Sequence, residues 1–153
     1  MEEIKLTTLV RRLALDEVGE ALSALCEEAI GAACRAYAPY SRFQVGAAAL
    51  LANGEVITGN NQENAAYPSG LCAERVALFY AAARYPDTPV TVLAIAALQE
   101  GKLVEGISPC GGCRQVMAEQ ERRQGIPMRL LLCGKSGMLS IESARSLLPL
   151  TFG

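Results

Sequence analysis

Three cysteines and a glutamate stand in two short motifs suited to metal binding and proton transfer. Cys110 and Cys113 form a Cys-x-x-Cys pair in "SPCGGCRQV", and Cys72 stands two residues before Glu74 in "GLCAER". Each segment opens a predicted helix, and the dipole of a helix favours the deprotonated form of a thiol at its N-terminus. The two glycines between Cys110 and Cys113 let the backbone pass close to an ion. These residues therefore form a candidate metal site.

The Cys-x-x-Cys pair alone fits a redox dithiol, half of a structural zinc site or two ligands of a catalytic zinc. A redox pair would not require Cys72, and a structural site of four cysteines would need a second Cys-x-x-Cys, which the sequence lacks. Three thiolates leave the fourth position of a tetrahedral zinc ion open for water. We therefore expect Cys72, Cys110 and Cys113 to bind one Zn²⁺ per subunit in a catalytic arrangement.

The chain contains no histidine. This excludes Ser-His-Asp triads, Cys-His pairs and every other mechanism in which histidine moves a proton. Glu74 becomes the candidate proton carrier, placed beside the metal without binding it. Three thiolates leave zinc with a net charge of about −1. Arg75 is expected to offset that charge by donating hydrogen bonds to a ligand sulfur, unless it forms an ordinary surface ion pair.

Length and composition predict one soluble domain. With 153 residues, 51% of them hydrophobic and 20% charged, the chain is long enough for a single core, so we treat residues 1–153 as one domain. A formal net charge of −2 and the lack of a basic run argue against nucleic acid as an obligatory partner. No signal peptide or membrane span is recognisable, which predicts a cytoplasmic protein without a membrane partner.

The remaining cysteines, Cys26, Cys34 and Cys133, each lie alone in apolar or alanine-rich sequence. In a reducing compartment cysteines rarely form disulfides. We therefore expect all six thiols to be reduced and these three to be buried.

The hydrophobic pattern predicts a helix, a hairpin and then alternating helices and strands. The hairpin turns at Asn53-Gly54, the strongest short hairpin signal. The predicted helices cover 16–37, 71–84, 110–125 and 140–148, and the predicted strands lie within 43–60, 89–98 and 127–134. This order indicates a three-layer α/β/α fold with a mixed sheet.

The predicted helix over 71–84 is apolar on nearly every side. A single covering layer cannot bury all of its faces, so its second face is expected to meet another subunit.

The chain resembles the zinc-dependent cytidine deaminases, and within them the small, homotetrameric type whose zinc ligands are all cysteines. The resemblance rests on Cys-Ala-Glu followed by Pro-Cys-Gly-Gly-Cys. It extends over "AYAPYSRFQVGAA", "NQENAAYPSGLCAER" and "LLPLTFG". Residues 1–15 fall outside it, as an extension that adds a strand or an intersubunit arm.

The resemblance implies hydrolytic deamination of cytidine and deoxycytidine in pyrimidine salvage. It assigns the zinc ligands as above and makes Glu74 the residue that takes a proton from water and passes it to the pyrimidine ring and the leaving amine. In such families the backbone N–H of the residue at Ala73 meets the cytosine carbonyl oxygen.

The resemblance also implies the residues that bind the nucleoside. Asn61 and Glu63 match a pair that recognises ribose hydroxyls, and Phe43 matches an aromatic residue that packs on the base. Tyr67 and Phe152 match residues that reach the site from a neighbouring subunit in tetrameric members. Since Glu63 would repel a phosphate, we expect an unphosphorylated nucleoside as substrate.

Other interpretations stay open. Asn61 and Glu63 fit an ordinary polar turn, Phe43 fits the hairpin core, and Tyr67 and Phe152 fit subunit packing. The substrate could be another cytosine-bearing compound, such as a nucleoside antibiotic or a nucleic-acid base. A non-catalytic zinc module or a redox protein would need the Cys-x-x-Cys pair but not Glu74.

Overall fold

A computed structural model describes residues 1–153 and contains one mixed sheet of seven strands. The strand order is β1-β7-β6-β4-β2-β3, and β5 pairs with an end of β4. Only β4 and β6 pair in parallel. The strands are β1 (Arg11–Leu13), β2 (Phe43–Leu51), β3 (Val56–Asn60), β4 (Val90–Gln99), β5 (Lys102–Leu103), β6 (Arg129–Gly134) and β7 (Gly137–Ile141).

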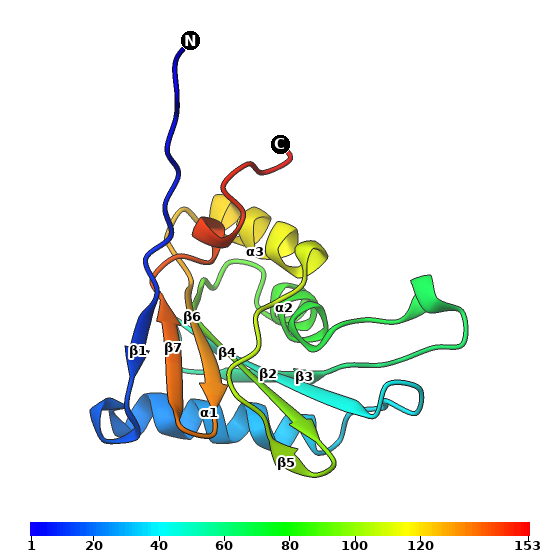
Figure 1. The fold of residues 1–153 in the computed structure, drawn as a ribbon. Helices are drawn as coiled ribbons and strands as arrows, with labels where there is room; N and C mark the ends of the chain where they lie inside the picture. The colour runs from blue at the N-terminus through cyan, green and yellow to red at the C-terminus, as the bar shows by residue number, and fades with distance from the viewer.

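Three helices cover the two faces of this sheet (Figure 1). Helix α1 (Glu20–Ala33) lies on one face, and α2 (Ala73–Arg84) and α3 (Gly111–Gln124) lie on the other. The expected three-layer α/β/α arrangement is therefore confirmed.

The central strand β4 has apolar side chains on both faces of the sheet, so helices must bury both faces. Its side chains alternate between two fully buried cores: Leu93 and Ile95 pack with residues of α2 and α3, and Ala94 and Ala96 pack with residues of α1. A strand buried on both faces is uniformly apolar, as the sequence of β4 is. The hairpin of β2 and β3, with its turn at Asn53-Gly54, also forms as expected.

The predicted helices are slightly too long at their N-termini. The first helix begins at Glu20 rather than Asp16, because residues 15–17 form a separate 3₁₀ turn in which the Ala14 N–H donates to Glu17 Oε2 (2.8 Å). Its predicted end at residue 37 is also wrong: the helix ends at Ala33, because turns that lead into Pro39 follow. The second helix begins at Ala73, since Cys72 is its extended N-cap. The third ends as predicted, at Gly125 with φ of 70°.

The predicted helix over 140–148 is wrong. Strand β7 occupies residues 137–141 and pairs with β6, where the Ser140 hydroxyl accepts a hydrogen bond from Arg129 Nε (2.9 Å). Only a 3₁₀ turn over Ala144–Leu147 follows. Pairing between neighbouring strands outweighs the local helical pattern in this segment.

The N-terminal extension adds a strand at the sheet edge. Strand β1 pairs antiparallel with β7, and the hydroxyl of Thr8 donates to the carbonyl of Ser146. Residues 1–7 extend beyond this contact and are exposed (Figure 1).

The expectation of six reduced thiols is wrong for one pair. Cys26 of α1 and Cys133 of β6 form a disulfide with a Cα–Cα distance of 6.0 Å. Both residues are buried, as expected, because they face each other in the core between α1 and the sheet. Cys34 was also expected to be buried, but it is exposed because it follows the last turn of α1.

Helix α2 is not buried on every side within this chain. Ala77, Leu78 and Ala81 are buried, in the same core as residues of the sheet, whereas Phe79 is 49% exposed and Tyr80 is 55% exposed. None of the helices has the length and hydropathy of a membrane-spanning segment.

Candidate metal centre and nucleoside cavity

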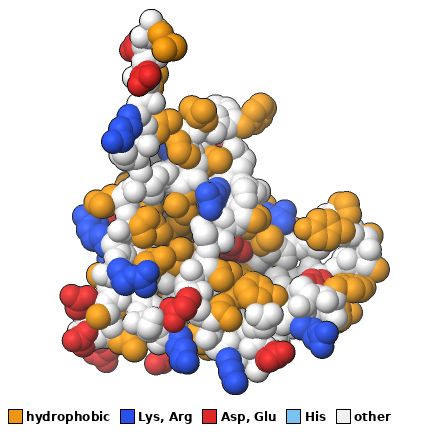
Figure 2. Space-filling model, in the orientation of Figure 1, with side chains coloured by type: hydrophobic (Ala, Val, Ile, Leu, Met, Phe, Trp, Pro, Cys, Tyr) orange, Lys and Arg blue, Asp and Glu red, His pale blue; other side chains and the backbone are white.

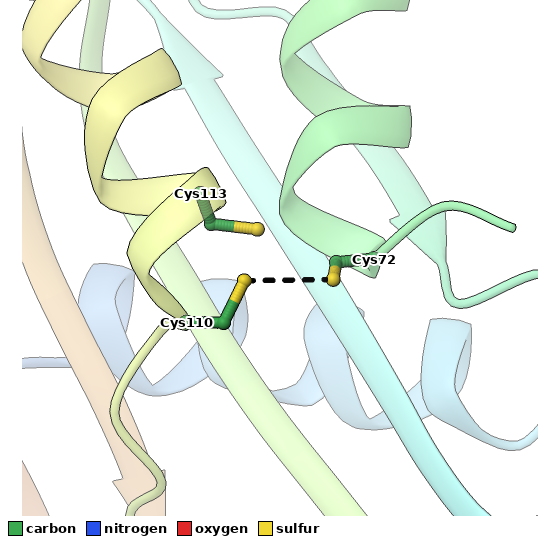
Figure 3. A group of neighbouring side chains, drawn as sticks. All are labelled: Cys72, Cys110 and Cys113. Carbon is green, nitrogen blue, oxygen red and sulfur yellow. Dashed lines mark hydrogen bonds between the residues drawn. The ribbon is translucent and has the colours of Figure 1, made fainter. Parts of the chain in front are cut away.

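The first turns of α2 and α3 bring three thiols together (Figure 3). Cys72 is the N-cap of α2, Cys110 is the N-cap of α3, and Cys113 lies in the first turn of α3. Their Sγ atoms all lie within 4.8 Å of one another, and those of Cys72 and Cys110 are 3.8 Å apart. Tetrahedral zinc with Zn–S bonds of about 2.3 Å separates its sulfur ligands by about 3.8 Å. The cluster therefore fits Zn²⁺.

Glycine at position 59 sets the position of Cys72. A Cβ atom there would lie 2.5 Å from the Ala77 nitrogen and 2.7 Å from the Ala73 carbonyl oxygen. Strand β3 and helix α2 can approach this closely only because Gly59 has no side chain. The start of α2, and with it Cys72, rests directly on the sheet.

Arg114 fixes the segment before α3. Its guanidinium donates to the carbonyls of Pro109 (2.9 Å) and Leu147 (3.1 Å) and to the Ser108 hydroxyl (2.9 Å). It thereby ties the Cys110 segment to the C-terminal 3₁₀ turn. Arg114 is not among the residues predicted for the site, and its position directly after Cys113 is the only signal of its role in the sequence.

The three thiols interact strongly. The hydrogen bond from Cys113 and the contact with Arg75 Nη2, which lies 3.6 Å from Cys72 Sγ, together lower the pKa of Cys72 to about 5, although burial raises it. The same interaction with Cys72, together with burial, raises the pKa of Cys113. One thiolate thus forms easily while the next is disfavoured, as expected of a cluster that needs a cation to hold several thiolates.

Glu74 lies in the first turn of α2 and is only 4% exposed. Burial raises its pKa, and the nearby Cys72 thiolate raises it further. A carboxyl group with a raised pKa holds its proton more firmly than an exposed one and is a better proton donor and acceptor in catalysis. Beside a metal-binding group of three thiols, such a carboxyl group can act as a general acid and base.

Arg75 lies between the metal cluster and an open cavity. It lines the cavity and contacts Cys72 through Nη2, while its buried Nε has no hydrogen-bond partner. The guanidinium is therefore close enough to offset negative charge on the Cys72 sulfur.

The cavity has a volume of about 750 Å³ and opens beside Cys72. Volumes of about 300–1,000 Å³ are typical of small-molecule sites. Asn61, Glu63 and Tyr67 line it. Phe43 does not; it is half-buried at the start of β2.

Hydrogen bonds hold the two polar candidates in the cavity, to backbone groups at Asn61 and to both backbone and side-chain groups at Glu63. Asn61 Oδ1 accepts from the Val45 N–H (2.7 Å), and Asn61 Nδ2 donates to the Phe43 carbonyl (3.0 Å). The Glu63 carboxylate accepts hydrogen bonds from the turn at Tyr40 and Ser41, which lowers its pKa. Neither Tyr40 nor Ser41 of this turn is among the residues predicted for the site.

Tyr67 and Phe152 are each 90% exposed in the single chain. Tyr67 lies on a segment that projects from the body of the molecule, where hydrophobic side chains gather (Figure 2). Phe152 lies in the C-terminal tail, where its backbone is bonded to the side chain of Gln115. The structure brings Tyr67 to the cavity but not Phe152.

Comparison with known proteins gives one consistent family. A family model described as the cytidine and deoxycytidylate deaminase zinc-binding region matches residues 20–126. A cytidine deaminase of Halalkalibacterium halodurans is 54% identical over 95 residues, which cover 62% of this chain and 68% of that protein. A cytidine deaminase of Mycobacterium tuberculosis is 46% identical over 88 residues, 58% of this chain and 62% of that protein.

Solved structures agree with these matches. The crystal structure of cytidine deaminase from Burkholderia pseudomallei is similar with a TM-score of 0.72 and 39% identity, covering 85% of this chain and 98% of that chain. The structure of cytidine deaminase from Mycobacterium tuberculosis is similar with a TM-score of 0.68 and 34% identity, covering 86% and 97%.

Proposed function

Because the chain belongs to the cytidine and deoxycytidylate deaminase family, we propose that it hydrolyses cytidine and deoxycytidine to uridine and deoxyuridine, with release of ammonia, in pyrimidine salvage. The observation that carries this proposal is the position of the buried Glu74 beside a three-thiol cluster with the geometry of a zinc site. A redox dithiol or a structural zinc module would have no use for such a carboxyl group.

Cys72, Cys110 and Cys113 would hold the zinc ion. When bound, Zn²⁺ supplies a Lewis acid that makes water a better nucleophile at neutral pH. Arg75 offsets part of the negative charge that the thiolates bring, through its contact with Cys72 Sγ.

Glu74 moves the protons of the reaction. It accepts one proton from the attacking water and delivers it to ring atom N3, and it then passes the second proton, from the hydroxyl now bonded to C4, to the amine, which leaves as ammonia. One water molecule is consumed and the cytosine C4–N4 bond is replaced by a C4–O bond, so no redox partner is required. The raised pKa of Glu74 supports this role, because the rise moves the carboxyl group toward the working pH, and proton transfer becomes more efficient in that direction.

The cytosine and the ribose are bound by separate groups. Ala73 occupies the first position of α2, where a backbone N–H has no partner within the helix and can donate to the cytosine carbonyl. Asn61 and Glu63 bind ribose hydroxyls, and Phe43 packs on the base. The negative charge of Glu63 disfavours a phosphorylated nucleoside.

We also propose that residues 1–153 form one domain and that four copies assemble into a tetramer. The half-exposed Phe79 and Tyr80 of α2 support a subunit interface there. The exposed Tyr67 and Phe152 support completion of each site by a neighbouring subunit.

The proposed location is the cytoplasm, without nucleic-acid or membrane partners. The four free cysteines and the acidic composition support it. The Cys26–Cys133 disulfide is the observation against it, since disulfides are rare in reducing compartments.

The direct test is the ultraviolet absorbance of cytidine and deoxycytidine incubated with the purified zinc-loaded protein, followed beside deoxycytidine monophosphate. We expect loss of the cytosine band with both nucleosides and a much slower loss with the phosphate. Faster turnover of the phosphate would contradict the role of Glu63. No turnover of either nucleoside would contradict the substrate, and modified nucleosides and nucleic acids would be tested next.

A further inference from the structure

The turn between α1 and β2 carries a hydroxyl that contacts two of the proposed binding residues. Ser41 Oγ donates to Glu63 Oε1 and accepts a hydrogen bond from the backbone N–H of Phe43 (3.0 Å). A serine hydroxyl offers one donor and two acceptor sites, so it makes both bonds at once. One side chain therefore links the proposed ribose-binding carboxylate to the strand that carries the proposed base-binding aromatic residue.

The two oxygens of Glu63 are held in different ways. Oε2 accepts from the backbone N–H groups of Tyr40 (2.8 Å) and Ser41 (3.2 Å), whereas Oε1 is held only by the Ser41 hydroxyl. Among these contacts, only the one at Oε1 can be removed by changing a side chain. The Ser41 hydroxyl is also the largest cause of the lowered pKa of Glu63, which keeps the carboxylate ionised and able to accept hydrogen bonds.

The same turn is strained at its centre. Arg42 has φ of 56°, a left-handed conformation that is unfavourable for residues other than glycine. The Arg42 N–H donates to the Ala38 carbonyl (3.0 Å), and the bond from the Phe43 N–H to Ser41 Oγ spans Arg42. Ser41 thus holds a conformation that the local backbone would not favour by itself.

These contacts face the proposed nucleoside site, because Tyr40, Ser41 and Glu63 all line the 750 Å³ cavity beside Cys72. We propose that Ser41 is a positioning residue, which fixes the Glu63 carboxylate in the orientation that receives the ribose hydroxyls. This inference rests on the proposed function. Ser41 acts through Glu63, so its contribution depends on the sugar hydroxyls of the substrate and not on the reacting carbon of the base.

The test compares the parent with Ser41→Ala, Ser41→Thr and Ser69→Ala. Ser69→Ala is the matched control, because Ser69 is exposed near the same cavity and its hydroxyl makes no hydrogen bond to the protein. Turnover of cytidine gives kcat and KM. The inhibition constant of 2′,3′-dideoxycytidine against cytidine measures binding of a nucleoside that lacks both ring hydroxyls.

We expect Ser41→Ala to raise KM for cytidine by about tenfold, the effect of one lost hydrogen bond to a charged group, with kcat within about twofold. The inhibition constant of dideoxycytidine should stay unchanged. Ser41→Thr keeps the hydroxyl and should restore the parent KM, and Ser69→Ala should match the parent. In a Glu63→Gln background, Ser41→Ala should produce no further tenfold increase in KM.

Two results would overturn the inference while leaving the proposed function intact: an unchanged KM in Ser41→Ala, or an equal loss of affinity for dideoxycytidine. Failure of Ser41→Thr to restore KM would also overturn it, because the hydroxyl would then not be the active group. If the parent itself fails to deaminate cytidine, the proposed function and this inference both fall.

Discussion

At the residue scale, the candidate centre combines three thiols and one buried carboxyl group within the first turns of two helices. The side chains differ strongly in exposure: Cys113 and Glu74 are buried, while Cys110 is open to solvent. Burial of Cys113 and Glu74 fixes their geometry and raises their pKa values, and the open cavity lies beside Cys72. Removal of a buried thiol should therefore lower the affinity for zinc.

Cys113→Ser should remove zinc. It replaces a fully buried sulfur of the cluster with a poorer zinc ligand, and the two remaining thiols do not enclose the ion. We expect zinc affinity to fall by more than about 100-fold, since loss of an outer-shell partner alone costs about 10–100-fold. Metal analysis after dialysis measures the ratio of zinc to chain. Cys34→Ser is the control, because Cys34 is exposed and outside the cluster; equal zinc retention by both variants would contradict the assignment.

The sequence was sufficient to predict that Cys72, Cys110 and Cys113 gather and that Glu74 lies beside them, because the spacing within each motif is local and these residue types are rare in combination. It was not sufficient to predict Ser41 or Arg114. Ser41 meets Glu63 across 22 positions of sequence, and Arg114 bonds carbonyl groups of the Pro109 segment and the C-terminal turn. Such bonds follow no sequence period, so they become visible only once the elements are packed together.

At the element scale, the site depends on how closely the helices approach the sheet. Gly59→Ala should push α2 away from β3, because the new Cβ atom would lie 2.5 Å from the Ala77 nitrogen. We expect the free energy of unfolding to fall by about 3 kcal/mol, at the upper end of the usual cost of overpacking. Cytidine turnover should fall with it, since Cys72 and Glu74 move with the start of α2. Chemical denaturation and a rate assay measure both.

Gly31→Ala provides the control for this change. Gly31 lies within α1, where a Cβ atom would meet nothing nearer than the Arg35 guanidinium at 4.0 Å. Alanine in a helix interior is more favourable than glycine by about 0.5–1 kcal/mol. Gly31→Ala should therefore be slightly stabilising and fully active. A Gly59→Ala variant as stable and active as Gly31→Ala would contradict the close packing of β3 on α2.

The secondary structure was predictable where the signals are local. The β2–β3 hairpin follows from Asn53-Gly54, and the end of α3 follows from Gly125. Strands β1 and β7 were not predictable. The segment "RRL" of β1 has no strand signal of its own and is a strand only because it pairs with β7. Strand β7 lies between β6 and β1 in the sheet. Its last residues have a helical sequence pattern, but pairing with the two neighbouring strands makes them a strand.

At the scale of the whole molecule, the Cys26–Cys133 disulfide closes a separation of 107 residues and ties α1 to the sheet. We expect four free thiols in the denatured, metal-free chain without reductant, measured by reaction with a thiol reagent. Reduction should lower the free energy of unfolding by about 2–5 kcal/mol, the usual contribution of a native disulfide. Six free thiols in protein prepared without reductant would contradict the disulfide.

The proposed tetramer is tested by light scattering at micromolar concentration. Four copies of the 16.2 kDa chain should scatter as one particle of four times that mass. The physical reason is the exposed apolar surface of α2, together with Tyr67 and Phe152, which a second copy would cover. A monomer at this concentration would contradict the proposal and would leave Tyr67 and Phe152 without their role at a neighbouring site.

The proposed function depends on proton transfer by Glu74. It is tested by measuring ammonia release from cytidine by the parent and by Glu74→Gln. Zinc content is measured first and must be equal in the two proteins. We expect release by the parent and a rate at least about 100-fold lower in the variant, because glutamine fills the same space but cannot accept the proton. Equal rates in the two zinc-loaded proteins would contradict the assignment of Glu74, and no release by either would contradict the deamination itself.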